Sequence, residues 1–228
     1  MLFRSVLVSA LWALAVAACA VATTRAQEGP AIPTLNFKLV DGFFHYPAYS
    51  VIGRLSGVAV SPGGNILMLN RGYHPVLEFK SDGSFLRTWG EGSGMFEGAH
   101  TLRFDKQGDL WYIDAADNMI FHFDKDGRTV SSLGTNPEPW TWLTHVIEHA
   151  APGPANFYQQ TDIGWSRDGS AFVSDGYGNS RVVKFNKDGN YVKSWGERGA
   201  QPGNFNTPHS LVRSEEHTSE LQSHLNLV

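Results

Sequence analysis

The segment "SDGSFLRTWG" at residues 81–90 returns twice, as "KDGRTVSSLG" at 125–134 and as "KDGNYVKSWG" at 187–196. A second set of glycine turns lies upstream of each, at "PGGN" (62–65), "KQGD" (106–109) and "RDGS" (167–170). The apolar runs "ILMLNRG", "LWYIDAA" and "AFVSDGY" separate the two sets. The upstream turns are spaced by about 44 and then about 61 residues, which indicates a repeated unit with an insertion of about 17 residues in its second copy.

Each unit predicts four antiparallel strands joined by tight turns. The Asp-Gly pairs supply the positive φ angles that a tight hairpin needs. Four strands in a repeat of about 40–45 residues are typical of a β-propeller blade, and propellers have four to eight blades. We therefore expect an all-β fold with a partial propeller over residues 51–212, which contains about three blades and an insertion at about 135–158. Residues 27–50 are expected to form an N-terminal linker and a lead-in strand.

Both ends of the chain have a different character from the repeats. Residues 1–26 contain Arg4 and then a long apolar stretch with small residues at the end, which predicts an export signal cleaved after Ala22 or Ala26. A retained membrane anchor is the alternative. Cys19 ends "VAAC", which resembles a bacterial lipoprotein signal, so a lipid anchor is a further alternative. We expect an exported protein, periplasmic or extracellular, whose mature chain has no disulfide.

The tail at residues 213–228 loses the apolar alternation. Its "RSEEHTSELQ" back-translates to a string that resembles a sequencing-library adapter read in frame. We interpret 213–228 as an adapter artefact that follows a C-terminal truncation near Val212, and a natural polar tail is the alternative.

Composition narrows the range of partners. The formal net charge is -4, and no basic run interrupts the repeats, which argues against nucleic acid as a partner. A small-molecule or peptide substrate is expected, with no membrane span in the mature chain; the oligomeric state is left open.

Histidine recurs in one register of the repeats. Aligned on the apolar residue of each first strand, the residue two places earlier is in turn Ser56, His100, Thr161 and His209. The first strand of every propeller blade lines the central channel, so these positions would form a ring. With six blades, alternation would place three histidines on that ring, which is a ligand set for catalytic zinc. Ordinary hydrogen-bonded channel histidines are the equal alternative.

The segments "FVSDGYGNSRVVKFNKDGNYVKSWG" (172–196) and "PGNFNTPHSL" (202–211) resemble the peptidyl-α-hydroxyglycine α-amidating lyases and their bacterial relatives. The resemblance runs from about Leu35 to Val212. It implies a six-bladed propeller of the NHL-repeat class. It also implies a zinc-dependent carbon–nitrogen lyase that splits N-acyl or peptidyl α-hydroxyglycine into an amide and glyoxylate.

The same resemblance implies roles for particular residues. Tyr177 in "SDGYGNSR" matches the tyrosine that takes the proton of the α-hydroxyl, and Arg71 in "NRGYH" matches the arginine that neutralises the substrate carboxylate and the tyrosinate. A packed channel tyrosine and a surface salt bridge are the alternatives for these two residues.

The resemblance implies two metals as well. His100 and His209 match two of three zinc ligands, and the backbone carbonyls of Val58 and Leu102 match ligands of a structural calcium. Lewis-acid polarisation of a substrate oxygen is the chemistry that Zn²⁺ would supply.

The insertion contains "HVIEH", His145–His149, which formally matches the inverted zinc-protease motif. Prolines bracket it, and a lid or rim loop of the propeller is the preferred interpretation. The remaining histidines of the repeats and of the linker, His45, His74 and His122, are interpreted as loop or strand-surface residues, with His74 as a neighbour of Arg71.

Two other functions compete with the lyase. A non-catalytic exported NHL propeller that binds protein or glycan needs no zinc. A lactonase-type propeller hydrolase holds calcium with Glu, Asp and Asn side chains in the channel, and such a set is not evident in this sequence.

Sequencing the source DNA beyond the Val212 codon is the first test. We expect about three more repeat units, with a histidine followed by an acid in the first strand of the sixth. A ring without that histidine would favour the binding scaffold, and DNA that encodes the present tail and then a stop codon would contradict the truncation hypothesis.

Overall fold

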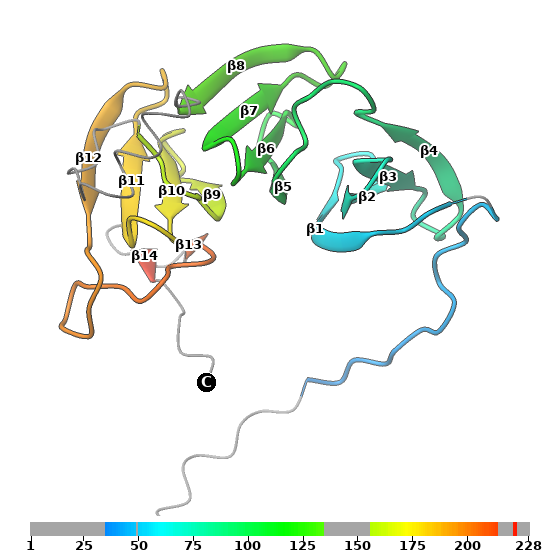
Figure 1. Cartoon of the computed structure of the whole chain (residues 1–228), viewed down its shortest axis with the longest axis horizontal. Helices are drawn as coiled ribbons and strands as arrows, with labels where there is room; N and C mark the ends of the chain where they lie inside the picture. Colours follow the sequence, from blue (N-terminus) through cyan, green and yellow to red (C-terminus); the bar gives the residue numbers. More distant parts are fainter. Residues whose placement is uncertain (1–34, 49, 135–155, 214–220, 223–228) are drawn as a thin grey trace, which may run out of the picture. The chain divides into compact units, whose positions relative to one another are not determined.

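The computed structural model describes residues 35–48, 50–134, 156–213 and 221–222 (Figure 1). The chain divides into two units, residues 1–41 and residues 42–228. The described part of the first unit, 35–41, contains no helix or strand. All elements below belong to the second unit.

Three four-stranded antiparallel sheets follow one another along the chain, coloured cyan to blue-green, green, and yellow to orange in Figure 1. The first contains β1 (Arg54–Val60), β2 (Ile66–Arg71), β3 (Val76–Phe79) and β4 (Phe85–Trp89). The second contains β5 (Ala99–Phe104), β6 (Leu110–Asp114), β7 (Met119–Phe123) and β8 (Thr129–Gly134). The third contains β9 (Asp162–Trp165), β10 (Ala171–Asp175), β11 (Arg181–Phe185) and β12 (Tyr191–Trp195). Strands pair in sequence order in every sheet, so the expected all-β fold with three blades is confirmed.

The hairpin turns differ in detail from the expected ones. Of each Asp-Gly pair only the glycine has a positive φ, for example Gly83 at 83° and Gly189 at 78°. In the first blade the Gly83 N–H donates to the Lys80 carbonyl, and the Lys80 N–H donates to the Ser84 carbonyl. This is the pattern of a turn closed by one left-handed glycine, so the aspartate is not required to adopt a positive φ.

Apolar side chains pack between successive sheets. Leu67 and Leu69 of β2 belong to one buried core cluster with Leu102 and Tyr112 of the second sheet. Because side chains alternate across a strand, the intervening Met68 faces the other way and packs with Phe44. The second and third sheets share a further core of Ile113, Ile120, Phe157, Ile163, Val173, Val183 and Phe185. The first strands β1, β5 and β9 contact one another in turn.

A buried polar residue closes the second strand of every blade. Asn70, Asp114 and Asp175 occupy the same register and are at most 1% exposed. Asn70 and Asp114 accept the N–H of the residue directly before the first strand of their own blade, Gly53 at 2.7 Å and Gly98 at 2.9 Å. Asp175 accepts the N–H of Tyr158 at 2.8 Å, farther upstream of β9. These bonds hold the segment that leads into each first strand.

The expected lead-in strand does not occur among the described residues 35–48 and 50, where His45 makes one isolated parallel bridge with Ser84. For residues 27–34, which lie outside the described ranges, it stays a prediction. The alignment of His209 with the first strand of a further unit is wrong in one respect: no strand begins at His209, because β13 covers only Val212–Arg213 and pairs with β14 (Leu221–Gln222). Leu211 instead donates its N–H to Asp162, a side chain of the third blade.

Several predictions concern segments outside the described residues. They are the export signal with Cys19, most of the insertion at 135–158 with its "HVIEH" motif, and most of the tail. The adapter interpretation of 213–228 therefore stays a prediction. Within the described ranges, no helix has the length and apolar character needed to cross a bilayer.

Asp114 offers a test of the buried polar closure. Its carboxylate accepts the N–H groups of Gly98, Ala116 and Asp117 and the hydroxyl of Tyr112. Asp114→Ala leaves these donors without a partner, and we expect the free energy of unfolding to fall by about 3 kcal/mol or more. Urea unfolding followed by tryptophan fluorescence measures the change. Asp126→Ala, in an exposed turn, is the matched control, and equal losses in the two variants would contradict this role.

Candidate active site

His100 stands at a β-bulge in the first strand of the second blade. Ala99 pairs with Asp114 and Thr101 pairs with Ile113, so His100 has no partner between them. Ser56 has the same place in β1, between Leu55 and Gly57. A bulge redirects one side chain out of the regular alternation. The shared register of Ser56 and His100 is thus a backbone irregularity common to the first two blades, and the pairing of β9 in the third blade shows no such shift.

A buried carboxylate holds the segment that carries His209. Asp162, at the start of β9, is 1% exposed and receives both Nε and Nη2 of Arg103, at 2.9 and 2.8 Å. The same carboxylate accepts Ser210 Oγ at 2.7 Å and Leu211 N at 3.0 Å. Asp162 therefore joins the first strands of the second and third blades to the residues that follow His209.

A second contact holds the residue that precedes His209 in the sequence. Thr161 Oγ1 donates to the Pro208 carbonyl at 2.8 Å. With Ser210 and Leu211 bound to Asp162, the residues on both sides of His209 are fixed to the third blade.

Tyr177 lies with its hydroxyl near both imidazoles. Its Oη is 2.8 Å from His209 Nε2 and 3.4 Å from His100 Nε2. The two imidazole ring centroids are 4.9 Å apart. The structure thus brings together three predicted site residues that lie far apart in the sequence, and their catalytic and metal-binding roles stay predictions.

The backbone around Tyr177 leaves no room for larger neighbours. A Cβ added to Gly176 would lie 2.1 Å from the Pro208 carbonyl oxygen, and one added to Gly178 would lie 1.7 Å from the Tyr158 ring. The Tyr177 N–H donates to the Gln159 carbonyl at 3.3 Å, and its own carbonyl accepts Arg198 Nη2 at 2.9 Å. The motif Gly-Tyr-Gly is therefore a steric requirement for presenting this tyrosine.

Arg71, the last residue of β2, borders the same space. Its Nε donates to the Ala99 carbonyl at 2.8 Å, while its Nη1 and Nη2 make no hydrogen bond or ion pair to the described part of the chain. A cavity of about 310 Å³ adjoins it, and its lining consists of Arg71, Glu97, Gly98, His100, Ala115, Ala116, Gln159 and Tyr177. Arg71 makes no salt bridge with any of the described residues, so its Nη1 and Nη2 are available to an anion as far as this part of the chain is concerned.

The electrostatic environment keeps His100 neutral. Burial, and then the positive charges of His209 and Arg71, together lower the pKa of His100 from 6.5 to about 4. Asp162 acts in the opposite direction but does not reverse the shift. A neutral imidazole has a free lone pair, which both a metal ligand and a hydrogen-bond acceptor require.

The donor set fits half of a tetrahedral zinc site. The Nε2 atoms of His100 and His209 both lie within hydrogen-bond distance of the Tyr177 hydroxyl. Histidine is a usual ligand of catalytic zinc. A complete site needs a further ligand, which the described residues around this point do not supply. For the calcium prediction, Val58 and Leu102 hold equivalent places in β1 and β5, which approach so closely that a Cβ on Gly57 would lie 3.2 Å from the His100 carbonyl oxygen.

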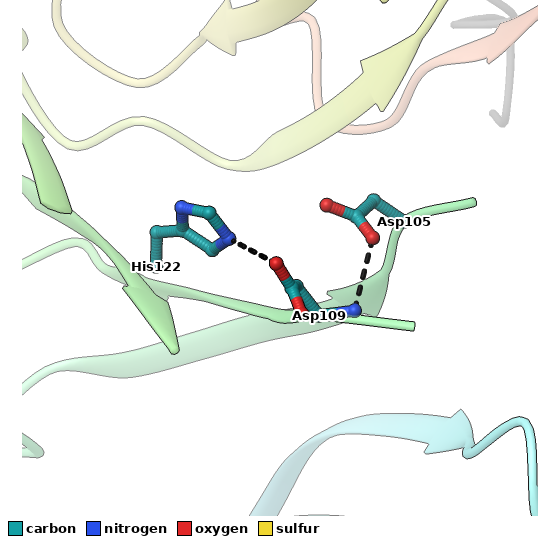
Figure 2. A group of neighbouring side chains, drawn as sticks. All are labelled: Asp105, Asp109 and His122. Carbon is teal, nitrogen blue, oxygen red and sulfur yellow. Dashed lines mark hydrogen bonds and ion pairs between the residues drawn. The ribbon is translucent and has the colours of Figure 1, made fainter. Parts of the chain in front are cut away.

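The other histidines lie elsewhere. His74 Nδ1 is 2.7 Å from Glu91 and does not line the cavity. His122 lies on β7, stacked on Trp111, with its Nε2 3.0 Å from Asp109. Asp105, Asp109 and His122 bring ligand atoms within 4.8 Å of one another (Figure 2). Asp105 already accepts the Asp109 N–H and the Trp111 indole N–H, so we assign this cluster to holding the β5–β6 turn.

Four residues of the site were missed at the level of sequence: Glu97, Gln159, Asp162 and Arg198. Asp162 could have been recognised from the sequence, because it is a charged residue in the apolar first strand of a blade. Burying such a charge is costly without a partner, so its position predicts a paired carboxylate. The other three lie in loops with no recognisable pattern.

No family model matches the chain. A Caenorhabditis elegans protein that carries the name of a peptidyl-alpha-hydroxyglycine alpha-amidating lyase is 30% identical over 191 residues, which are 72% of this chain and 51% of that protein. Human NHL repeat-containing protein 3 is 27% identical over 185 residues, 77% of this chain and 50% of that protein. The chain spans between about a fifth and about a half of the length of its curated relatives.

Solved structures with the same fold include a Bacteroides thetaiotaomicron protein of unknown function, with a TM-score of 0.51 and 14% identity over 70% of this chain and 42% of that chain. At this identity the likeness concerns the fold alone.

The lowered pKa of His100 predicts a pH dependence for the metal-free protein. Between pH 6.5 and about 4 the unfolded chain binds a proton at this position and the folded chain does not. The free energy of unfolding should therefore decrease as the pH falls through this range, and this contribution should level off below about pH 4. His100→Gln should flatten the decrease in urea-unfolding curves, and the exposed His45→Gln is the control. An unchanged slope in His100→Gln would contradict the burial of a neutral imidazole.

Proposed function

Because the chain belongs to the NHL-repeat family that contains the amidating lyases, we propose that the full-length protein is an exported lyase acting on N-acyl or peptidyl α-hydroxyglycine. It would break the bond between the α-carbon and nitrogen and release an amide and glyoxylate. The observation that supports this most is the position of Tyr177 Oη, within 3.4 Å of both imidazoles and beside an arginine with free Nη atoms.

Arg71 would bind the substrate carboxylate. Its two Nη groups form a planar fork that matches a carboxylate in two parallel hydrogen bonds. Its Nε is already held by the Ala99 carbonyl, so the fork is oriented before the substrate arrives. Such pre-orientation reduces the entropy lost on binding.

Tyr177 would move the proton. In its ionised form the phenol takes the proton of the α-hydroxyl, the oxygen's electron pair becomes the second bond of the glyoxylate carbonyl, and the carbon–nitrogen bond breaks. The leaving nitrogen takes the proton back from the Tyr177 phenol and becomes the amide, which regenerates the phenolate. A phenolate needs positive charge nearby, and the Arg71 guanidinium supplies it.

His100 and His209 would hold the zinc ion, together with a ligand from outside the described residues. When it is bound, Lewis-acid polarisation of a substrate oxygen is the chemistry it adds. The carbonyls of Val58 and Leu102 would serve a structural calcium, which has no part in the proton transfer.

Glyoxylate release tests the proposal. The zinc-loaded full-length protein should release glyoxylate from N-benzoyl-α-hydroxyglycine, and Tyr177→Phe should lower kcat by about 10²- to 10⁴-fold, because it removes the group that accepts the proton. Tyr191→Phe, on β12 and outside the site, is the matched control.

Two results would contradict the proposal. No glyoxylate from a zinc-loaded wild-type protein would favour the binding scaffold, and unchanged turnover in Tyr177→Phe would refute the role of that hydroxyl. Circular dichroism of each variant shows whether the fold is retained. His209→Ala should lose bound zinc as well as activity.

A further inference from the structure

Gln159 has a backbone conformation that side-chain-bearing residues rarely adopt. Its φ is 58°, in the left-handed region that costs any residue with a Cβ. Two hydrogen bonds maintain it: the Gln159 N–H donates to Asn118 Oδ1 at 2.7 Å, and its carbonyl accepts the Tyr177 N–H at 3.3 Å. Asn118 is itself 2% exposed. A strained conformation that its surroundings enforce is a common feature of functional sites.

Gln159 belongs to the lining of the cavity. It is exposed and lines the cavity together with Tyr177 and Arg71, and its carboxamide makes no hydrogen bond to the described part of the chain. The adjacent Gln160 shows the contrast, because it is fully buried and donates to the carbonyls of Asp114 and Met119. Of two neighbouring glutamines, one holds the second and third blades together, and the other is part of the cavity lining and has a carboxamide that is unused within the described residues.

The cavity is also asymmetric in charge. Arg71 is the cation of its lining and Glu97, an exposed carboxylate, is the anion. Asp114 and Asp117 are further acidic residues near Glu97. Burial, and then the negative charges of Asp114 and Glu97, raise the pKa of Asp117. A ligand that places one carboxylate on Arg71 would meet repulsion if it carried a second negative charge toward Glu97.

We propose that Gln159 is a specificity-determining residue whose carboxamide binds the first peptide group upstream of the bond that is broken. A carboxamide carries both a donor and an acceptor, so it can pair with the N–H and the carbonyl of one peptide group. The site would then prefer peptidyl over simple acyl hydroxyglycines, and Glu97 would disfavour an acidic residue before the hydroxyglycine. This inference rests on the proposed lyase function and adds the substrate class to it.

Two substrates separate recognition from general support of Tyr177. N-benzoyl-α-hydroxyglycine has no upstream peptide group, whereas N-acetylphenylalanyl-α-hydroxyglycine has one and a similar aromatic ring. Gln159→Gly removes the carboxamide and keeps the positive φ without steric cost. In the full-length protein it should lower kcat/KM for the peptidyl substrate by about five- to tenfold, mainly through KM, and change that for the benzoyl substrate by less than about twofold.

Further variants sharpen the result. Gln159→Asn retains a carboxamide and tolerates a positive φ, so it should restore part of the preference. Thr207→Gly is the matched control, because Thr207 has the same φ of 58° and does not line the cavity. Glu97→Gln should raise kcat/KM for an N-acetylglutamyl substrate more than for the phenylalanyl one. Equal losses on both substrates in Gln159→Gly, or no loss on either, would overturn the proposal.

Binding of unreactive analogues keeps this test apart from that of the lyase activity. N-acetylphenylalanylglycine and N-benzoylglycine lack the α-hydroxyl and cannot be cleaved. If the zinc-loaded wild-type protein cleaves neither substrate, the lyase proposal fails. Calorimetry with the two analogues then decides the role of Gln159: weaker binding of the peptidyl analogue alone in Gln159→Gly supports it, and equal binding refutes it.

Discussion

One buried carboxylate, that of Asp162, is the constraint on which the site depends. It binds the guanidinium of Arg103 from the second blade and the backbone and hydroxyl groups that follow His209. A carboxylate inside a protein is tolerated only when opposite charge and hydrogen bonds compensate for its lost hydration. The partners that satisfy Asp162 are also those that place His209 next to His100, so the stability of the centre and its geometry have one physical cause.

The site itself is built from irregularities of an otherwise regular repeat. His100 occupies a bulge, Gln159 a left-handed conformation, and Tyr177 a turn in which both neighbouring glycines are sterically required. The regular strands and their apolar core stabilise the fold. The bulge, the left-handed residue and the glycine-flanked turn instead bring their side chains close together. Such separation of a rigid scaffold from strained, functional loops is frequent in proteins.

The cavity lining contains both a cationic and an anionic side chain, which restricts how a charged ligand can be oriented in it. Arg71 lines the cavity with two nitrogens that make no hydrogen bond or ion pair to the described residues, and Glu97 lines it with a carboxylate. The buried His100 remains uncharged because its desolvation and its cationic neighbours oppose protonation. A substrate with one carboxylate and an uncharged or basic remainder suits this arrangement. The carboxamide of Gln159 adds a group that recognises a neutral peptide rather than a charge.

The sequence by itself determined the all-β fold, the three repeated units and their glycine turns, because strand periodicity and turn chemistry are local properties. It also singled out His100, His209, Tyr177 and Arg71, through a shared register and motifs that resemble a known family. It could not show that Asp162 links successive blades or that Gln159 lines the cavity, and it placed a strand at His209 where the structure begins one only at Val212. Those features depend on which donors and acceptors meet across residues distant in the chain, and only the packed blades decide that.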